Sequence, residues 1–347
     1  MSDQDGNLKG ILVGCGFMGG MHAQIYNILE GVDLVAAVDK RVEESREKLD
    51  RLGCRARVYA TLDEAMAQAQ CDFVDVCLPT HLHEAFSIKA LDAGKALFCE
   101  KPLALTVEKA DEIIEAAKRN DAIAQVGHCL RFWPEYQKLM EYHSSEEGGK
   151  LLSLSFVRRG ARPNFGVDDW FNDERLSGSA ALDLHIHDTD IMLAMLGQPK
   201  VIHSKVTRDY SGPSHIYSLF EYDSLIVSSE GGFNYPAKWG FQMAFQAIFE
   251  KAVLDFDSTN GKGLMICQGD EEPSQMEVPK PDTGSSQSGE GNVSDLGGYF
   301  NELQYFTKCL KTGKKPEIAT LEEAREAVAM ALKEVAIAEG KLRRYEL

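Results

Sequence analysis

The stretch that decides the fold of the amino-terminal region is GILVGCGFMG, residues 10–19. Its apolar residues predict a buried strand, and the amphipathic stretch 18–29 predicts a helix directly after the glycine turn. In such a turn, Gly14 permits the tight bend, Gly16 lets the backbone approach a pyrophosphate, and Gly19 lets the helix pack on the strand. The pattern therefore predicts a dinucleotide-binding unit.

The alternation of apolar runs with helical patterns continues to about residue 127. Further apolar runs lie at 34–38, 57–59, 73–77, 96–99 and 123–126. Apolar strands that are separated by helices indicate a parallel sheet covered on both faces. We therefore expect a doubly wound Rossmann domain over residues 1–127.

The pattern changes in the remainder of the chain, which we assign to a second domain at 128–347. Segment 152–157 alternates apolar and polar residues, and similar segments follow between about 200 and 267. Such alternation predicts an antiparallel sheet. Helices are expected at 179–196, 297–312 and 320–339, the last two free to pack back on the first domain. Residues 268–298, rich in Asp, Glu, Ser, Gly and Pro, predict a long loop.

Charge and cysteine usage restrict the partners and the compartment. The 347 residues include 37 basic and 54 acidic side chains, a formal net charge of −17. This balance argues against nucleic acid and anionic membranes as partners. No apolar run approaches the ~18 residues of a membrane span, and the eight cysteines include no Cys-x-x-Cys pair. We expect a soluble, cytoplasmic protein with reduced thiols.

Asp39 indicates which dinucleotide is favoured. It lies 20 residues after Gly19, at the end of the second expected strand. A carboxylate there can bind the adenine ribose hydroxyls and repels a 2′-phosphate, so NAD is favoured. Lys40 and Arg41 follow directly and could accommodate that phosphate, so NADP stays an alternative. The expected cofactor contacts in this region are Gly14, Gly16, Phe17, Met18, Gly19, Asp39 and Lys40.

Three features in a fixed order resemble one protein family. Glu100-Lys101-Pro102 follows an expected strand of the dinucleotide domain, and the second domain carries Asp183-x-x-x-His187-Asp188. Their order and spacing resemble the glucose–fructose oxidoreductase / inositol dehydrogenase / rhizopine-catabolism (Gfo/Idh/MocA) family. The likeness covers nearly the whole chain and includes residues 79–83, 131–134 and 178–188.

The resemblance implies an NAD(P)-dependent oxidoreductase that acts on a secondary hydroxyl of a sugar, sugar derivative or cyclitol. It also implies an α+β second domain with an open, mostly antiparallel sheet, whose broad face commonly mediates oligomerisation, here as a homodimer or homotetramer. Two positions depart from the family. Ser179 stands where relatives often carry a glycine, and Thr80-His81 differs from the Asn-containing version expected before His83.

Lys101, Asp183 and His187 are the candidate catalytic residues. Asp183 and His187 are four residues apart and share one face of a helix. A carboxylate behind an imidazole supports the charge that forms when the ring accepts a proton, so His187 is the expected base and Asp183 its orienting partner or a substrate contact. The Lys101 ammonium could stabilise alkoxide character on the reacting oxygen. His185 should point elsewhere, into packing or an interface.

Other residues are assigned to contacts with the ligands. Further cofactor contacts are expected from Pro79, Thr80, His83, Glu100 and Lys101, with helix capping as the alternative for His83. Substrate contacts are expected from Lys101, Arg131, Trp170, Asp183, His187 and Tyr235.

Three alternatives compete with this interpretation. The His185-Ile186-His187-Asp188 run invites a metal site, but residues i and i+2 of a helix diverge by roughly 200°, and no second cluster completes a tetrahedral set. We therefore expect no metal. Some relatives retain NAD and cleave glycosidic bonds through transient oxidation of the sugar. A non-catalytic, cofactor-binding regulator is the remaining alternative.

Overall fold

The computed structural model describes residues 6–164, 166–279, 281 and 297–343, which form two compact units. Unit 1 contains the described parts of Met1–Cys129, Phe165–Asp168 and Pro281–Arg325. Unit 2 contains those of Leu130–Asn164, Asp169–Lys280 and Glu326–Leu347. The helix expected at 297–312 therefore belongs to unit 1 although it follows most of unit 2 in the sequence.

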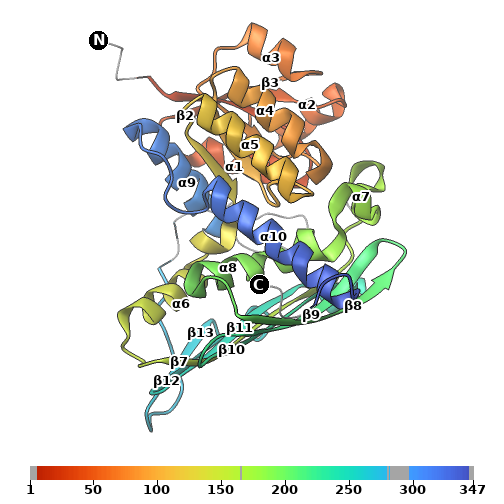
Figure 1. Cartoon of the computed structure of the whole chain (residues 1–347). Helices are drawn as coiled ribbons and strands as arrows, with labels where there is room; N and C mark the ends of the chain where they lie inside the picture. Colours follow the sequence, from red (N-terminus) through yellow and green to blue (C-terminus); the bar gives the residue numbers. More distant parts are fainter. Residues whose placement is uncertain (1–5, 165, 280, 282–296, 344–347) are drawn as a thin grey trace. The chain divides into compact units, whose positions relative to one another are not determined.

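Unit 1 is built on a sheet of six parallel strands in the order β3-β2-β1-β4-β5-β6 (Figure 1). The strands are β1 (Leu8–Val13), β2 (Val32–Val38), β3 (Arg57–Tyr59), β4 (Phe73–Val76), β5 (Ala96–Glu100) and β6 (Ala124–Gly127). This doubly wound order confirms the expected Rossmann fold. Ligands of such sheets bind where the order reverses, here between β1 and β4.

The helices of unit 1 include one directly after the glycine turn and one at the expected range 297–312. These helices are α1 (Phe17–Ile28), α2 (Val42–Arg51), α3 (Leu62–Gln68), α4 (His83–Asp92), α5 (Val107–Arg119) and α9 (Gly297–Thr312). The side chains of Thr61 and Thr106 accept hydrogen bonds from the backbone N–H groups of Glu64 and Lys109. Each threonine therefore caps the amino end of its helix.

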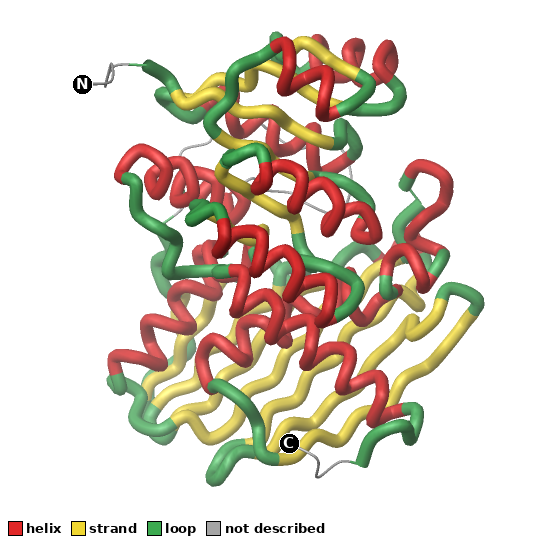
Figure 2. Tube along the Cα trace, turned by 45° about the horizontal axis from the view of Figure 1, so that its top comes forward, coloured by secondary structure: helices red, strands yellow, loops and turns green. Residues whose placement is uncertain are grey.

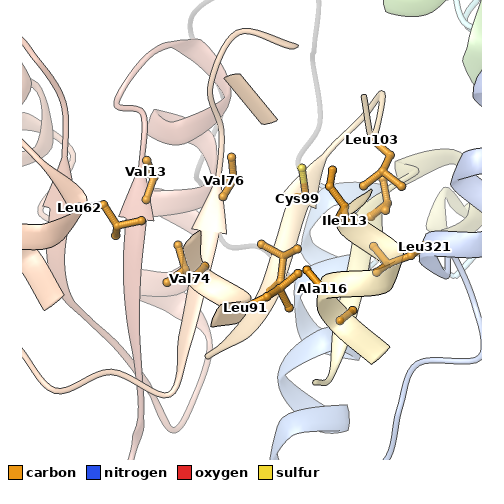
Figure 3. Packing of buried hydrophobic residues seen from close by; sticks show 14 of the residues in the cluster. Val13, Leu62, Val74, Val76, Leu91, Cys99, Leu103, Ile113, Ala116 and Leu321 are labelled. Carbon is orange, nitrogen blue, oxygen red and sulfur yellow. The ribbon is translucent and has the colours of Figure 1, made fainter. Parts of the chain in front are cut away.

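Apolar side chains cover both faces of this sheet. On one face, α3, α4, α5 and the start of α10 (Leu321–Ala338) pack against alternate residues of the strands (Figure 3). The cluster includes Val13, Leu62, Val74, Val76, Leu91, Cys99, Ile113 and Leu321. On the other face, α1 and α9 pack against β4 and β5. There the Phe306 ring lies 5.6 Å from Phe73 and 5.4 Å from Phe98, measured between centroids.

Unit 2 is built on an eight-stranded sheet in the order β14-β13-β12-β11-β7-β10-β9-β8 (Figure 2). Its strands are β7 (Leu151–Ala161), β8 (Val201–Asp209), β9 (Gly212–Glu221), β10 (Ile226–Tyr235), β11 (Gln242–Phe249), β12 (Ala252–Asp257), β13 (Leu264–Gln268) and β14 (Ser274–Gln275). Only β7 and β10 pair in parallel, and the other neighbours are antiparallel. This confirms the mostly antiparallel sheet.

Helices cover one face of this second sheet. Apolar side chains of α6 (Pro134–Ser145), α8 (Ile186–Leu196) and the unit 2 part of α10 pack on the alternate buried residues of β7, β9, β10 and β11. The short helix α7 (Glu174–Ser177) precedes α8. The opposite face carries exposed apolar side chains, among them Tyr217, Leu219, Ile226 and Ile248.

Three further expectations concern the chain as a whole. Most of the loop expected at 268–298 lies outside the described residues, and the described part contains β14. The structure joins none of the eight cysteines in a disulfide. No helix in the described part of the chain is long and apolar enough to cross a bilayer.

Candidate active site

The glycine turn after β1 leaves space for a ligand. Gly14 has a φ of +95°, and a Cβ there would lie 2.4 Å from the carbonyl oxygen of Cys77. A Cβ on Gly19 would lie 1.8 Å from the carbonyl oxygen of Gly14, whereas one on Gly16 would meet nothing within 4 Å. Gly16 also caps α1 without a side-chain hydrogen bond. The positive end of α1 and an open backbone therefore meet here, as a pyrophosphate requires.

Asp39 follows β2 and is fixed beside this turn. Its Oδ2 accepts a hydrogen bond from the Cys15 N–H at 3.0 Å, and its Oδ1 accepts one from the Arg41 N–H at 2.9 Å. Burial, reinforced by the Asp39 charge, raises the pKa of the Cys15 thiol to about 12, so that thiol stays neutral. Lys40 is exposed and forms an ion pair with Asp168. The residues present fit a dinucleotide with free ribose hydroxyls.

Lys101 follows the last residue of β5, and its surroundings are charged. The backbone N–H of Lys101 donates to Glu100 Oε2 at 3.0 Å. Glu100 Oε1 accepts from His22 Nε2 at 3.1 Å, and His22 Nδ1 donates to Asp75 Oδ2 at 2.8 Å. Sequence reasoning missed His22 and Asp75. The available signal was Asp75, the one polar residue of β4, and His22, a polar residue on the mostly apolar helix α1.

The surroundings of the His22 ring favour its protonated form, the imidazolium. A neutral imidazole carries one N–H, but both nitrogens of this ring face carboxylates. Burial opposes the charge, yet the neighbouring Asp75 carboxylate and the Cys77 thiol together raise the pKa of His22 well above its ordinary value. Burial likewise opposes the charge of Glu100, but the hydrogen bond and charge of His22 lower the pKa of that carboxyl. The network therefore holds one cation between two anions.

His83, at the start of α4, is buried and contacts backbone rather than side chains. Its Nδ1 lies 2.7 Å from the carbonyl oxygen of Pro102, and its Nε2 lies 2.8 Å from that of Leu78. The ring therefore joins the loop after β4 to the residue after Lys101. Pro79 and Thr80 lie in the same loop, with Thr80 buried. Their contacts with the cofactor, like that of His83, stay predictions.

Asp183 and His187 lie in unit 2, where the expected helix begins irregularly. Residues Ala181–His185 form a π-helical turn, and α8 begins at Ile186. Such turns occur frequently at functional sites. The preceding residues, Gly178 and Ser179, have φ values of +71° and +55°. Ser179 thus occupies a left-handed conformation that favours glycine.

Two buried ion pairs fix the start of α8. The Arg158 guanidinium donates from Nη2 to Asp188 Oδ1 at 2.7 Å and from Nε to Asp188 Oδ2 at 3.1 Å. Arg131 donates from Nε to Asp190 Oδ2 at 2.6 Å and from Nη2 to Asp190 Oδ1 at 2.9 Å. Both pairs are bidentate, the geometry that best compensates for lost hydration. The backbone on the carboxyl side of His187 is therefore rigidly held.

His185 faces inward, as expected for a packing residue. Its Nε2 lies 2.7 Å from Glu334 Oε2, and the same carboxylate accepts hydrogen bonds from Thr189 and Ser218. Burial lowers the pKa of His185, but the Glu334 charge outweighs it and the net shift is upward.

Apart from Asp183 and His187, the predicted substrate contacts of unit 2 lie in different surroundings. Arg131 is buried in its ion pair with Asp190. Trp170 stacks on Phe171 with ring centroids 3.9 Å apart. Tyr235 ends β10 and lies 5.6 Å from the Trp239 ring. Their contacts with substrate stay predictions.

Two groups of side chains in the described residues have the spacing of metal ligands. One is His22, Asp75 and Cys77, and the other is His22, Glu100 and Glu302. Both His22 nitrogens are already engaged by carboxylates within these groups. Neither group includes His187.

Two family models match consecutive parts of the chain. The model described as "Oxidoreductase family, NAD-binding Rossmann fold" matches residues 8–128. The model described as "GFO/IDH/MocA C-terminal domain" matches residues 136–254. The first match covers the glycine turn, Asp39 and Lys101, and the second covers Asp183 and His187.

Individual proteins agree with these models. An inositol 2-dehydrogenase of Burkholderia lata is 31% identical over 265 residues, which cover 73% of this chain and 75% of the relative. An uncharacterized oxidoreductase of Rhizobium meliloti is 30% identical over 158 residues, so the match spans only 46% of that relative. A structure of levoglucosan dehydrogenase with NADH and levoglucosan has a TM-score of 0.81 at 18% identity, covering 97% of this chain and 98% of that one. The last likeness shows the fold.

Proposed function

Because the chain belongs to the Gfo/Idh/MocA family of NAD-binding oxidoreductases, we propose that it transfers a hydride between a nicotinamide cofactor and a secondary hydroxyl of a sugar, sugar derivative or cyclitol. The inositol 2-dehydrogenase of Burkholderia lata favours a polyol ring as the substrate class. The observation that carries the proposal is the glycine turn, because its open Gly16 and the amino end of α1 suit a pyrophosphate.

The cofactor is held by residues of unit 1. Gly14, Gly16 and Gly19 leave room for the pyrophosphate, and Asp39 accepts hydrogen bonds from the adenine ribose. When bound, the nicotinamide supplies the hydride acceptor for the substrate carbon. NAD is the preferred form, since the fixed Asp39 carboxylate beside the turn would repel a 2′-phosphate. The exposed ammonium of Lys40 forms an ion pair with Asp168 and is not positioned by the glycine turn.

The proton of the substrate hydroxyl passes to His187. Its neutral imidazole accepts the proton as the C–H bond breaks, and Asp183 stabilises the resulting imidazolium. The rigid Arg158–Asp188 pair next to His187 supports this role, because a general base must be held in place. Lys101 stabilises the negative charge that develops on the oxygen.

A spectrophotometric assay tests the proposal. Purified protein receives NAD or NADP in turn with a panel of cyclitols and sugars, and net formation of reduced nicotinamide is followed by absorbance. Turnover with one polyol class supports the proposal and measures the cofactor preference. Silence across the panel, combined with cleavage of a glycoside by protein that retains its cofactor, would contradict it.

Single substitutions test the assigned roles. His187→Ala should lower kcat by about 10²- to 10⁴-fold, the usual contribution of a general base, with NAD affinity unchanged. Lys101→Met should also lower kcat, because methionine keeps the apolar stem and removes the charge. Wild-type turnover in either variant would remove that residue from the mechanism.

The open face of the second sheet is proposed as the contact between two copies of this chain. Tyr217, Leu219, Ile226 and Ile248 expose apolar surface on β9, β10 and β11, and Ile226 and Ile248 both pair with Ser153 of the central strand β7. Light scattering should give a dimer or tetramer for the wild type and a smaller species for Leu219→Lys/Ile226→Lys. A monomeric wild type would contradict this proposal.

A further inference from the structure

Residues that the proposed mechanism does not use contact the chain immediately before and after Lys101. We infer that two buried histidines, His22 and His83, are positioning residues that hold the backbone of Lys101 so that its ammonium meets the reacting oxygen. This inference rests on the proposed function, since it requires Lys101 to act on the substrate. All of the contacts that carry it lie within unit 1.

The first set of contacts is made by the carboxylate of Glu100. This carboxylate uses Oε2 to accept the Lys101 N–H at 3.0 Å and Oε1 to accept the His22 N–H at 3.1 Å. His22 is in turn anchored on Asp75 of β4 at 2.8 Å. The backbone nitrogen of Lys101 is therefore linked through the buried side chains of Glu100 and His22 to strand β4 and to helix α1.

The adjacent strand is shaped to accept the Glu100 side chain. Glu100 pairs in register with Gly127 of β6. A Cβ on Gly127 would lie 3.2 Å from both Cδ and Oε2 of Glu100 and 3.3 Å from Oε1. Those separations are tighter than ordinary van der Waals contact, so the absence of a side chain at residue 127 gives the carboxylate its place. An alanine there would displace it by a few tenths of an ångström without removing any charge.

The second set of contacts is made by His83 with the residue after Lys101. His83 lies 2.7 Å from the carbonyl oxygen of Pro102, and its other nitrogen lies 2.8 Å from that of Leu78. Burial lowers the pKa of His83, so the neutral ring donates only one of these two hydrogen bonds, and the buried ring lies between the segment after β5 and the loop after β4. Together, His22 and His83 hold the residues immediately before and after Lys101.

A structural role alone does not account for this arrangement. Buried charges cost more to desolvate than apolar side chains of similar volume, and replacing such a network by apolar residues is often neutral or stabilising. Here His22, Asp75 and Glu100 are all buried directly behind Lys101. A charged, directional network gives what apolar packing cannot, which is a defined position for one backbone N–H group.

A double-mutant cycle tests the inference. The variants are His22→Gln, Gly127→Ala and His83→Gln, each made in the wild type and in Lys101→Met. The readouts are kcat and KM for NAD with the panel polyol that turns over fastest, the Kd for NADH by fluorescence, and the melting temperature. In the wild type, each change should lower kcat by about tenfold, less than the roughly 100-fold effect of a misplacement of 1 Å, and the NADH Kd of His22→Gln and Gly127→Ala should change by less than about threefold.

The cycle separates positioning from general damage. In the Lys101→Met background, the same changes should lower kcat by less than about twofold further, because coupled residues are not additive. Leu97→Val is the matched control, since Leu97 is fully buried in the same strand β5 but has no polar group in its side chain. It should lower the melting temperature and leave kcat at the wild-type value. A crystal structure of Gly127→Ala should show a shifted Lys101 backbone.

Each contrary outcome has one meaning. Wild-type kcat in His22→Gln, Gly127→Ala and His83→Gln, with kcat lowered in Lys101→Met, would overturn the inference and leave the proposed function intact. Equal losses in both backgrounds would also overturn it, because they would reflect damage unrelated to Lys101. Wild-type kcat in Lys101→Met would instead overturn the role of Lys101 in the proposed function. Should His22→Gln not fold, Gly127→Ala carries the test, since it changes no ionisable group.

Discussion

Replacing Glu302 with glutamine asks whether the folded protein keeps a proton on a buried carboxyl. Glu302 lies on α9 and is fully buried, and neither carboxyl oxygen has a hydrogen-bond partner among the described residues. Burial, reinforced by the negative charges of Glu100 and Asp75, raises the pKa of Glu302 well above its ordinary value, although His22 acts in the opposite direction. We therefore expect Glu302 to be neutral in the folded state.

The pH dependence follows from this proton. Above pH 4.5, the ordinary pKa of the side chain, the unfolded chain loses the proton and the folded chain keeps it. Each further pH unit therefore lowers the free energy of unfolding by about 1.4 kcal/mol, until the raised pKa is reached. The loss of stability therefore accumulates with rising pH for as long as Glu302 keeps its proton in the folded state. Glutamine cannot ionise, so the stability of Glu302→Gln relative to wild type should rise by about 1.4 kcal/mol per unit.

Urea unfolding between pH 5 and pH 8 measures this slope. The additional N–H of glutamine costs about 1–3 kcal/mol if it stays unsatisfied, but this offset does not vary with pH. Far-UV circular dichroism reports both units, whereas tryptophan fluorescence reports unit 2, because Trp133, Trp170 and Trp239 all lie there. Parallel pH profiles for variant and wild type would refute the reasoning and show that Glu302 is ionised when folded.

Glu334→Gln is the matched control for that experiment. Glu334 is also fully buried, but its carboxylate faces His185 Nε2 at 2.7 Å and accepts a hydrogen bond from Thr189 at 3.1 Å. Removing one charge of a buried pair leaves the other uncompensated. This variant should therefore lose about 3 kcal/mol at neutral pH, the opposite sign to the effect of Glu302→Gln.

Three further substitutions test local geometry. Ser179→Gly should raise the melting temperature by about 1–3 °C in scanning calorimetry. A left-handed serine costs about 1–2 kcal/mol, and the larger unfolded-state entropy of glycine cancels part of the gain from removing that strain. A lower melting temperature would mean that the hydroxyl contact with Ser211 outweighs the strain. Gly19→Ala should weaken NADH binding by at least about 100-fold in a fluorescence titration, since its Cβ would collide with the carbonyl of Gly14, and retained affinity would argue against this turn as the pyrophosphate site. Asp39→Ser should lower the ratio of kcat/KM for NAD to that for NADP by at least about tenfold, and an unchanged ratio would remove Asp39 from the ribose site.

The Rossmann sheet could be predicted because its determinants are local. Apolar strands, the glycine turn and threonine caps such as Thr61 each act within a few residues. The charged network around Glu100 could not be predicted in this way. His22 lies 78 residues away from Glu100 in the sequence, and Glu302 lies on a helix that follows the strands of the second sheet in the sequence. Isolated polar residues in apolar elements signal such a network without naming its partners.

The segment that carries Asp183 and His187 shows a different limit. The spacing of Asp183 and His187 predicts a regular helix, but the structure has a π-helical turn there. A π turn depends on the packing of the whole segment, which a period of four residues does not reveal. By contrast, the sequence alone shows that Ser179 departs from the glycine that relatives often carry there. The structure supplies its physical meaning, a left-handed backbone at a non-glycine residue.

The order in which the ribosome delivers unit 1 has a cost for its folding. Strands β1 to β6 emerge within the first 129 residues, but α9, with Leu303 and Phe306, is synthesised only after β7 to β14. Until then, the nascent chain exposes Phe73 and Phe98, against which Phe306 packs in the finished protein. Exposed aromatic surface of this kind promotes aggregation and attracts chaperones. A fragment that ends near residue 150 should for the same reason be poorly soluble, although it encodes every strand of the nucleotide-binding sheet.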